Sequence, residues 1–194
     1  MYQHIKRLID IVLSLGAIVV LSPVLLLLAV LIKLDSKGPV LFKQKRVGKD
    51  KTHFEILKFR TMYADVPKDV PTHLLADPES KITKIGRFLR KSSLDELPQI
   101  FNIFKGEMSI IGPRPALWNQ FDLIAERDKY GANDVRPGLT GLAQVMGRDE
   151  LPIEVKAKYD GEYAQNVTFA NDVKIFFKTI TSVLGAKGVK EGKQ

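Results

Sequence analysis

The chain contains no cysteine, and histidine occurs only three times in 194 residues. The absence of cysteine excludes disulfide bonds and thiolate metal sites, and it is typical of proteins from a reducing compartment. The histidines His4, His53 and His73 do not have the spacing of a zinc site. Any metal ion bound here should therefore be a hard cation held by oxygen ligands.

Aromatic residues are also scarce, at 8% of the chain, and most of them fall at apolar positions of predicted helices. Proteins that bind single-stranded nucleic acid use exposed aromatic rings to stack on the bases. The basic balance, a net charge of +8 with a pI of about 9.6, is the only feature that suggests a nucleic-acid binder. We therefore expect no nucleic-acid partner.

One long uncharged run covers Ile11–Ile32, a total of 22 residues. A straight helix rises about 1.5 Å per residue, so this run would extend ~33 Å, which is enough for a bilayer core of ~30 Å. The run also exceeds the core of a signal peptide, which has roughly 7–15 residues. Its length and composition predict a membrane-inserted helix.

Ser22 and Pro23 stand at the centre of this run. Proline has no N–H to bond the carbonyl of Val19, and its ring crowds that carbonyl, so the helix should kink or break here. Inside a membrane the freed carbonyl needs a partner, and the Ser22 hydroxyl is the nearest candidate. A break would divide the run into two arms of about a dozen residues, each ~18 Å long.

Positive charge lies on both sides of the run. Lys6 and Arg7 precede it, and nine Lys and Arg residues against three acids occupy positions 33–60. A spanning helix with cations at both ends conflicts with the positive-inside rule, whereas a re-entrant hairpin with both ends on the cytoplasmic face obeys it. Asp10 follows Arg7 and Lys6 by three and four residues, so an ion pair could carry this acid into the headgroup region. The residues alone leave both topologies open.

The rest of the chain predicts one compact domain of the α+β class, mostly helical. We place a membrane-inserted helix-break-helix at 1–36, the compact domain at 37–185 and a disordered tail at 186–194. Two β-prone runs, 40–47 and 52–59, flank a four-residue turn and predict a β-hairpin.

Helical periodicity recurs through the compact domain. It occupies, in order, residues 82–91, 93–106, 117–129, 152–164 and 169–184. Ser93 and Glu96 match a capping box, which predicts that the second of these helices begins there. Residues 135–148 hold three glycines and a proline and predict a shaped loop. The last helix has an apolar face, including Phe169 and Phe176, that could pack into the core or lie in the membrane interface.

Asp95 and Glu96 are the carboxylate pair with the most informative context. In the first turn of a helix, the dipole and the free N–H groups favour negative charge. Adjacent side chains diverge by about 100° on a helix, so one carboxylate can face a reacting phosphorus atom while the other holds a metal ion. The structural alternative is that Glu96 completes the capping box and Asp95 only complements the dipole. Glu96 cannot easily do both.

Basic residues suited to phosphate occur in several patterned stretches, at Lys58, Arg60, Arg87, Arg114, Arg136 and Arg148. Arginine matches phosphate oxygens bidentately, and Arg114, held between two prolines, loses little entropy on binding. Taken singly, each is explained as well by a solvated surface charge. Together with the carboxylate pair, and without a histidine or cysteine nucleophile, they indicate phosphoryl chemistry with a divalent cation.

Several motifs occur together along the chain: Lys6-Arg7 with Asp10, the apolar run with Ser22-Pro23, LKFRTM at 57–62, LDELPQ at 94–99, IIGPRP at 110–115, VRPGLTGLAQVMGR at 135–148 and KYD at 158–160. In this set the chain resembles the bacterial sugar transferases, and more narrowly the small monotopic phosphoglycosyl transferases that begin membrane glycoconjugate assembly. The resemblance covers nearly the whole chain. LDELPQ alone would be a modest signal, but the agreement of all these motifs is specific.

The resemblance implies a Mg²⁺-dependent enzyme that moves a phosphosugar from a UDP-sugar to undecaprenyl phosphate and releases UMP. In such enzymes the Asp of the pair, here Asp95, is the nucleophile, and the Glu, here Glu96, helps to bind magnesium. Phosphate and nucleotide contacts would fall to the matching basic residues, and Asp160 would have a supporting polar role. The matching basic residues are Lys58, Arg60, Arg114, Arg136 and Arg148, and we add Arg87, from the basic face of its helix, as a substrate-binding candidate.

The resemblance also implies a monotopic protein of the bacterial inner membrane. Its re-entrant segment, turning at Ser22-Pro23, would keep Lys6, Arg7 and the catalytic domain on the cytoplasmic face, with amphipathic helices in the membrane interface. A homodimer stays open. The rival interpretation of the residues is a non-enzymatic membrane adaptor, whose basic face would hold anionic lipid or a partner protein.

Overall fold

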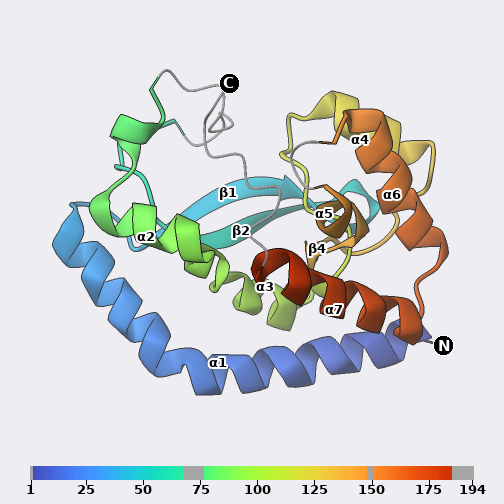
Figure 1. Cartoon of the computed structure of the whole chain (residues 1–194), viewed down its shortest axis with the longest axis horizontal. Helices are drawn as coiled ribbons and strands as arrows, with labels where there is room; N and C mark the ends of the chain where they lie inside the picture. The colour runs from blue at the N-terminus through green and yellow to red at the C-terminus, as the bar shows by residue number, and fades with distance from the viewer. Residues whose placement is uncertain (1, 68–76, 148–150, 185–194) are drawn as a thin grey trace.

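The computed structural model describes residues 2–67, 77–147 and 151–184 (Figure 1). It is a mostly helical α+β protein, as predicted, in which one long helix curves beneath a set of shorter elements. The tail at 186–194, predicted to be disordered, lies outside the described residues.

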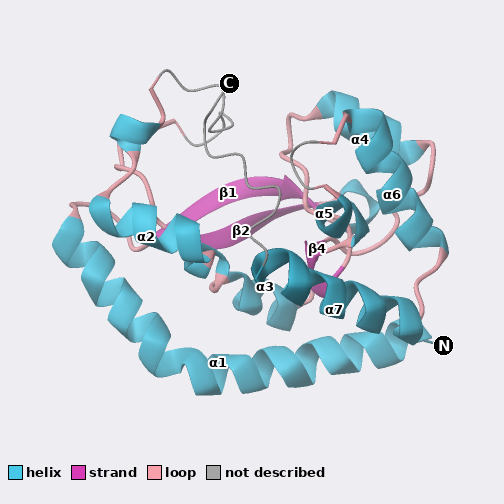
Figure 2. Ribbon diagram, in the orientation of Figure 1, coloured by secondary structure: helices cyan, strands magenta, loops and turns pink. Residues whose placement is uncertain are grey.

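The elements follow one another as α1 (Tyr2–Asp35), β1 (Leu41–Val47), η1 (Lys49–Lys51), β2 (His53–Phe59), η3 (Glu79–Lys81), α2 (Lys84–Ser92), η4 (Leu94–Glu96), α3 (Gln99–Lys105), β3 (Ser109–Ile111), α4 (Phe121–Asp128), β4 (Gly138–Thr140), α5 (Leu142–Met146), α6 (Ile153–Gln165) and α7 (Phe169–Leu184), where η marks a short 3-10 helix. The strands form two separate pairs, β1 with β2 and β3 with β4. Both α2 and α3 contact α1, and α3 also contacts β2, so these two helices lie between α1 and the β1–β2 hairpin (Figure 2).

Helix α1 passes through Pro23 without ending and bends in its middle (Figure 1). The Ser22 hydroxyl donates a hydrogen bond of 2.8 Å to the carbonyl of Val19, which is the carbonyl that proline deprives of its N–H. This confirms the partner predicted from the sequence. Because the freed carbonyl is satisfied within the helix, the helix kinks here and does not break. Within the described chain α1 is the one helix long and apolar enough to cross a membrane.

The N-terminal end of α1 is fixed to the compact domain by three charged side chains. Lys6 forms an ion pair of 2.7 Å with Asp172 of α7. Arg7 donates to two backbone carbonyls of α3, both at 2.7 Å. Asp10 is buried and accepts the N–H of Ile110 in β3 at 3.0 Å. The ion pair predicted between Asp10 and its basic neighbours is therefore wrong, because Asp10 bonds a strand and Lys6 pairs with another helix.

The C-terminal end of α1 is fixed to the same domain. Arg60, which is buried, donates to the Ser36 hydroxyl at 2.7 Å, to the Ser36 carbonyl at 2.8 Å and to the Pro39 carbonyl at 2.6 Å. Asp35 accepts the backbone N–H of Ile85 in α2 at 3.2 Å. A guanidinium from the end of β2 thus holds the chain segment that follows α1.

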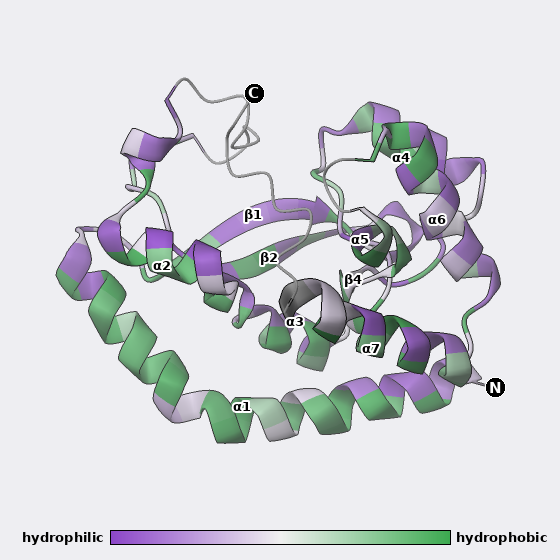
Figure 3. Ribbon diagram, viewed as in Figure 1, coloured by the Kyte–Doolittle hydropathy of each residue, from purple (hydrophilic) through white to green (hydrophobic). Residues whose placement is uncertain are grey.

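An apolar cluster joins this end of α1 to the rest of the core. Its buried members are Leu28 and Ile32 of α1, Phe59 of β2 and Leu89 of α2. Between the two fixed ends, apolar residues of α1 such as Val20 are exposed. The ribbon of α1 is mostly hydrophobic along this stretch (Figure 3). The helix is therefore packed at both ends and unpacked along one side of its middle.

The β1–β2 hairpin matches its prediction. The strands are antiparallel, and their register runs from the pair Leu41–Phe59 to the pair Val47–His53. Asp50, in the η1 turn, has a φ of 53°, a left-handed conformation that Asp tolerates better than most residues. Alternating apolar residues and a polar turn were enough to predict this unit.

The stretch predicted as a shaped loop at 135–148 instead holds β4 and α5. Strand β4 is parallel to β3, with Ser109 opposite Gly138. A Cβ at Gly138 would lie 2.1 Å from the backbone nitrogen of Gly112. Only glycine therefore fits at this position, where the two backbones are in contact. Strands of three residues are too short to show an alternating pattern of apolar and polar residues. Glycines also lack a side chain and therefore add no such signal.

The capping box predicted at Ser93 is not formed. Ser93 has a φ of 56° and ends α2, and its side chain makes no capping hydrogen bond to η4. Helix α3 begins later, at Gln99, and ends at Gly106 as predicted. The Glu96 carboxylate, which would have completed the box, bonds basic side chains of other elements.

The sequence left open whether the apolar face of the last helix packs into the core or lies in the membrane interface. In the structure α7 exposes much of this face. Phe169, Phe176 and Phe177 are 60%, 48% and 62% exposed, whereas Asp172 and Ile175 are buried. Phe169 also makes an edge contact with Tyr2 at the start of α1. Packing of this face into the core is therefore wrong, because these aromatic rings are exposed. Helix α7 itself lies beside the first half of α1 (Figure 3).

We expect Asp172→Ala to lower the free energy of unfolding by about 3 kcal/mol, because it leaves Lys6 buried without its counter-ion. The side chains of this pair are only 13% and 10% exposed. Chemical denaturation in detergent measures the loss. The control is Lys51→Ala, which breaks a pair with Asp128 whose side chains are 55% and 44% exposed and should cost less than about 1 kcal/mol. Equal losses in the two variants would contradict the prediction.

Candidate active site

Asp95 and Glu96 lie in the short η4 turn, which packs against α2 and β2. Leu94 and Leu97 on either side are partly buried against the apolar cluster that includes α1 residues. Both carboxylate residues are only partly buried. The flanking leucines thus anchor the turn and leave the two carboxylates at its surface.

Glu96 is the centre of a small ion-pair network. Lys58 of β2 donates to its Oε1 at 2.7 Å, and Arg114 donates to the same oxygen at 3.0 Å. Burial acts to raise the pKa of Glu96, but the charges and hydrogen bonds of Arg114 and Lys58 prevail and hold that pKa well below its usual range. Glu96 is therefore ionised at neutral pH, and two of the predicted phosphate contacts meet at it.

Asp95 has a different environment from its neighbour. Burial raises its pKa and the charge of Glu96 adds to this, while Lys58 and Arg114 oppose it. Within the described part of the chain, the ion pairs of this site all involve Glu96, and Asp95 takes part in none of them. The two adjacent carboxylates therefore have different electrostatic surroundings.

A buried ion pair supports the backbone of Arg114. Arg127 of α4 donates to both the backbone carbonyl of Arg114, at 3.0 Å, and the carboxylate of Asp160 in α6, at 2.6 and 2.9 Å. The side chains of Arg127 and Asp160 are 4% and 1% exposed. Asp160 therefore supports the turn that carries Arg114 and does not itself face the carboxylate pair.

Arg127 was missed from the sequence, although one signal was present. It follows the buried Leu123 by four residues, so it had to lie on the inner face of α4. A charged residue at such a position requires a buried partner.

Arg46 was also missed. It donates to the carbonyl of Pro115 at 2.9 Å and to the side chain of Gln44. Burial, with a contribution from the charge of Arg114, lowers the pKa of Arg46 to about 10. In β1 this residue shares a face with Gln44, and like Arg127 it donates to a backbone carbonyl of the turn that carries Arg114.

The remaining predicted contacts do not gather around Glu96. Arg60 lies at the end of α1, Arg87 is exposed on α2, and Arg136 donates to the carbonyl of Gly106 at 3.0 Å near the start of α1. Arg148 lies outside the described residues. The structure thus brings together the carboxylate pair, Lys58 and Arg114, with Asp160 behind them.

The carboxylates of the site fit a metal ion only in part. Within residues 2–67, 77–147 and 151–184, no group of three or more potential metal-ligating side chains is present. Mg²⁺, however, is commonly bound by one or two carboxylates and completed by substrate phosphates. Both hydrogen bonds to Glu96 are made to Oε1, and Oε2 takes part in neither. The site therefore fits a Mg²⁺ ion whose other ligands come from a phosphate-bearing substrate.

Comparison with known proteins identifies the family of this chain. A family model described as bacterial sugar transferase matches residues 1–186. The chain belongs to the bacterial sugar transferase family. This confirms the resemblance to the bacterial sugar transferases that was inferred from the motifs.

Three relatives illustrate the similarity. The chain is 41% identical over 195 residues to a UDP-N-acetylgalactosamine-undecaprenyl-phosphate N-acetylgalactosaminephosphotransferase of Aeromonas hydrophila, with 97% of this chain and 46% of that protein covered. It is 35% identical over 200 residues to an undecaprenyl-phosphate galactose phosphotransferase of Salmonella typhimurium, with coverages of 96% and 42%. It is 37% identical over 187 residues to the uncharacterized sugar transferase EpsL of Bacillus subtilis, with coverages of 96% and 91%. The chain thus spans less than half of the first two relatives and nearly all of the third.

The Arg127–Asp160 pair can be tested by a double-mutant cycle. Arg127→Gln and Asp160→Asn should each lower the free energy of unfolding by about 3 kcal/mol or more when the partner charge stays buried. The double variant should lose clearly less than the sum of the two, because no uncompensated charge remains. Denaturant unfolding of the four proteins measures the coupling. Strict additivity would show that the two side chains do not act as a pair.

Proposed function

We propose that the protein transfers a phosphosugar from a UDP-sugar to a polyprenyl phosphate, such as undecaprenyl phosphate, and releases UMP. The observation that carries this proposal is the pair of adjacent carboxylates in different environments, with Lys58 and Arg114 converging on Glu96. The names of the relatives from A. hydrophila and S. typhimurium support the reaction class. The product, a polyprenyl diphosphate sugar, begins the assembly of a membrane glycoconjugate.

In the first step a carboxylate oxygen of Asp95 attacks the sugar-linked phosphorus of the UDP-sugar. The bond from that phosphorus to the bridging oxygen breaks, and UMP leaves with the electron pair. The phosphosugar is then held on Asp95 as an acyl phosphate. No general base is required, because the attacking oxygen belongs to the ionised form of the carboxylate.

In the second step an oxygen of the polyprenyl phosphate attacks the same phosphorus, and the bond to Asp95 breaks. The carboxylate is restored and the polyprenyl diphosphate sugar is released. Covalent catalysis divides one transfer between two anions into two steps. Lys58 and Arg114 lie where they can reduce the negative charge around both phosphates.

Glu96 would hold Mg²⁺ together with the diphosphate, and the ion would offset the negative charge of the substrate and of the transition state. Lys58 and Arg114 keep Glu96 ionised and therefore ready to bind a cation. Arg87, Arg136 and Arg148 stay predicted substrate contacts.

We further propose that α1 enters and leaves one leaflet as a re-entrant helix, with the catalytic domain on the cytoplasmic face of the bacterial inner membrane. A helix that crosses the bilayer could not keep both ends on one domain, yet Lys6 and Arg60 join opposite ends of α1 to the same domain. The exposed apolar residues in the middle of α1 would then enter the lipid, while α7 lies along the interface with Phe176 and Phe177 toward it.

The chemistry is tested by incubating the purified protein with Mg²⁺ and a panel of UDP-sugars, followed by assays of UMP release and of a phosphosugar adduct by intact-protein mass spectrometry. Asp95→Asn should abolish both, since the amide cannot attack phosphorus, and EDTA should suppress both in the unaltered protein. Asp122→Asn, which neutralises an exposed carboxylate of α4, should leave both unchanged. An Asp95→Asn variant with normal turnover would refute the mechanism.

The topology is tested separately. Because the chain lacks cysteine, Gln3→Cys and Lys51→Cys each provide a single labelling site. For a re-entrant helix, a membrane-impermeant maleimide should label neither variant in intact cells and both after permeabilisation. Labelling of Gln3→Cys, but not Lys51→Cys, in intact cells would establish a spanning helix with its N-terminus outside.

A further inference from the structure

Arg46 of β1 is a cation without an acidic partner among the described residues. Its guanidinium donates to the carbonyl of Pro115 at 2.9 Å and to the side chain of Gln44, and neither acceptor is charged. The ion pairs within the described part of the chain do not include Arg46. The side chain is partly buried, and its Nε has no hydrogen-bond partner there. A cation in such a place is costly unless an anion balances its charge.

Arg46 projects from the face of the hairpin that also carries Lys58. Lys58 is paired with Phe42 across the two strands, so these two side chains share a face. Gln44 and Arg46 follow Phe42 by two and four residues and project from the same face. Glu96 lies at this face, because Lys58 bonds its carboxylate at 2.7 Å. Four residues of strand extend ~13 Å, so Arg46 and Lys58 stand at different ends of the face.

Arg46 stands at the end of the site that Arg114 occupies. Burial lowers the pKa of Arg46 to about 10, and of the neighbouring charges Arg114 adds to this and Glu96 opposes it, so Arg46 is still positive at neutral pH. Among the cations that act on the pKa of Asp95, Lys58 has a larger effect than Arg114. Asp95 therefore lies toward the Lys58 end of the site, and Arg46 lies toward the other end.

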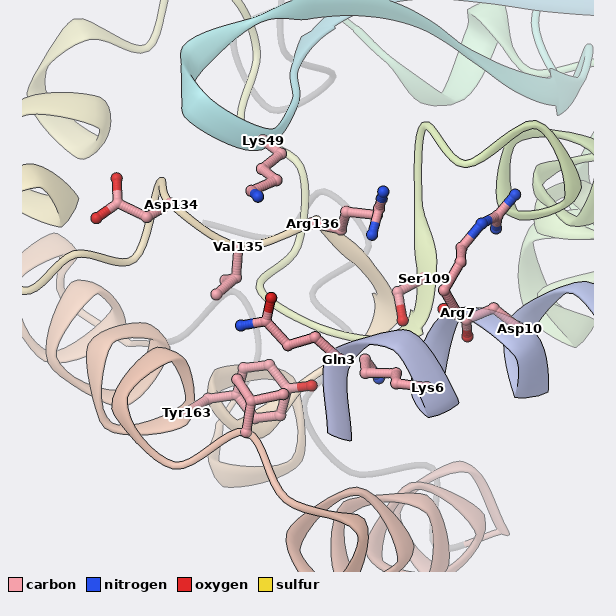
Figure 4. A pocket seen from close by; sticks show the side chains of 11 residues that line it. Gln3, Lys6, Arg7, Asp10, Lys49, Ser109, Asp134, Val135, Arg136 and Tyr163 are labelled. Carbon is pink, nitrogen blue, oxygen red and sulfur yellow. The ribbon is translucent and has the colours of Figure 1, made fainter. Parts of the chain in front are cut away.

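Arg136, a predicted phosphate contact, lies apart from this group of cations. It lines a small cavity beside the start of α1 (Figure 4), and the carboxylate pair is not part of that lining. Its guanidinium donates to the carbonyl of Gly106 at 3.0 Å. Arg46, and not Arg136, is therefore a further cation beside Arg114 and Glu96.

We infer that Arg46 binds the phosphate of the leaving group, which departs as UMP. The inference rests on the proposed function. When Asp95 attacks the sugar-linked phosphorus, the leaving oxygen lies roughly in line with the attacking oxygen and opposite to it. The UMP phosphate is therefore on the side remote from Asp95, where Arg46 and Arg114 stand.

The charge of Arg46 suits this step. As the bond from phosphorus to the bridging oxygen breaks, its electron pair stays with UMP, whose phosphate gains a second negative charge. A guanidinium forms strong, charge-assisted hydrogen bonds with phosphate oxygens. The departing phosphate thus supplies the anion that Arg46 lacks in the free protein.

Isothermal titration of the purified protein with UMP, in the presence of Mg²⁺, tests the inference. Arg46→Gln should raise the Kd for UMP about tenfold or more, the loss expected for a hydrogen bond to a charged group. Arg46→Lys, which restores the charge, should recover most of the affinity. Lys43→Gln removes an exposed cation from the opposite face of the same strand and should bind UMP like the unaltered protein. Uridine, which lacks the phosphate, should bind all four proteins equally.

Thermal unfolding separates this role from a structural one. Arg46→Gln should not lower the Tm of the ligand-free protein, because it removes a partly buried charge that no acid balances. A fall in Tm together with equal losses of UMP and uridine binding would assign Arg46 to support of the turn at Pro115 and overturn the inference. An unchanged Kd for UMP in Arg46→Gln, or an equal loss in Lys43→Gln, would overturn it as well.

UMP binding requires no transfer of a phosphosugar, so this test and the test of Asp95 fail separately. Absence of UMP release from every UDP-sugar by the unaltered protein would contradict the proposed function. An Arg46→Gln variant that binds UMP normally would contradict only the role of Arg46.

Discussion

Both ends of α1 are fixed to one folded domain, and the position of the carboxylate pair depends on this constraint. The start of the helix is tied to α3, β3 and α7 through Lys6, Arg7 and Asp10. Its end is tied to β2 through Arg60 and an apolar cluster, and the leucines on either side of Asp95 and Glu96 pack against that same cluster. The position of η4 relative to the end of α1 is consequently set by the apolar cluster that they share.

A short 3-10 turn gives two adjacent carboxylates opposite electrostatic surroundings. Glu96 takes both neighbouring cations and has its pKa lowered, while burial raises the pKa of Asp95. This division does not come from helix geometry alone, because it depends on Lys58 from one strand and Arg114 from a distant turn. Arg46 and Arg127 hold that turn by donating hydrogen bonds to its backbone carbonyls. The position of Arg114 at the site therefore depends on residues that do not contact the carboxylate pair.

The sequence predicted those features that depend on local pattern. The hairpin followed from alternation, and the Ser22 hydroxyl was identified as the partner of Val19 from the chemistry of proline. Features that depend on long-range contacts were not predictable in the same way. The capping box predicted at Ser93 matched a local sequence rule. It does not form, and Glu96 instead bonds two cations from distant parts of the chain. Strands β3 and β4 meet through glycine backbones, which carry no hydropathy signal. The Arg127–Asp160 pair joins two helices, and neither residue reveals its partner.

Lys58 and Arg60 are separated by a single residue, yet they contact different parts of the protein. Lys58 bonds the carboxylate of Glu96, and Arg60 bonds the end of α1. Over two residues an extended chain advances only about 7 Å. An insertion or deletion at Phe59 would turn one of the two side chains to the opposite face of the hairpin. Length variation is therefore incompatible with this position, because it would separate the contact with α1 from the contact with Glu96.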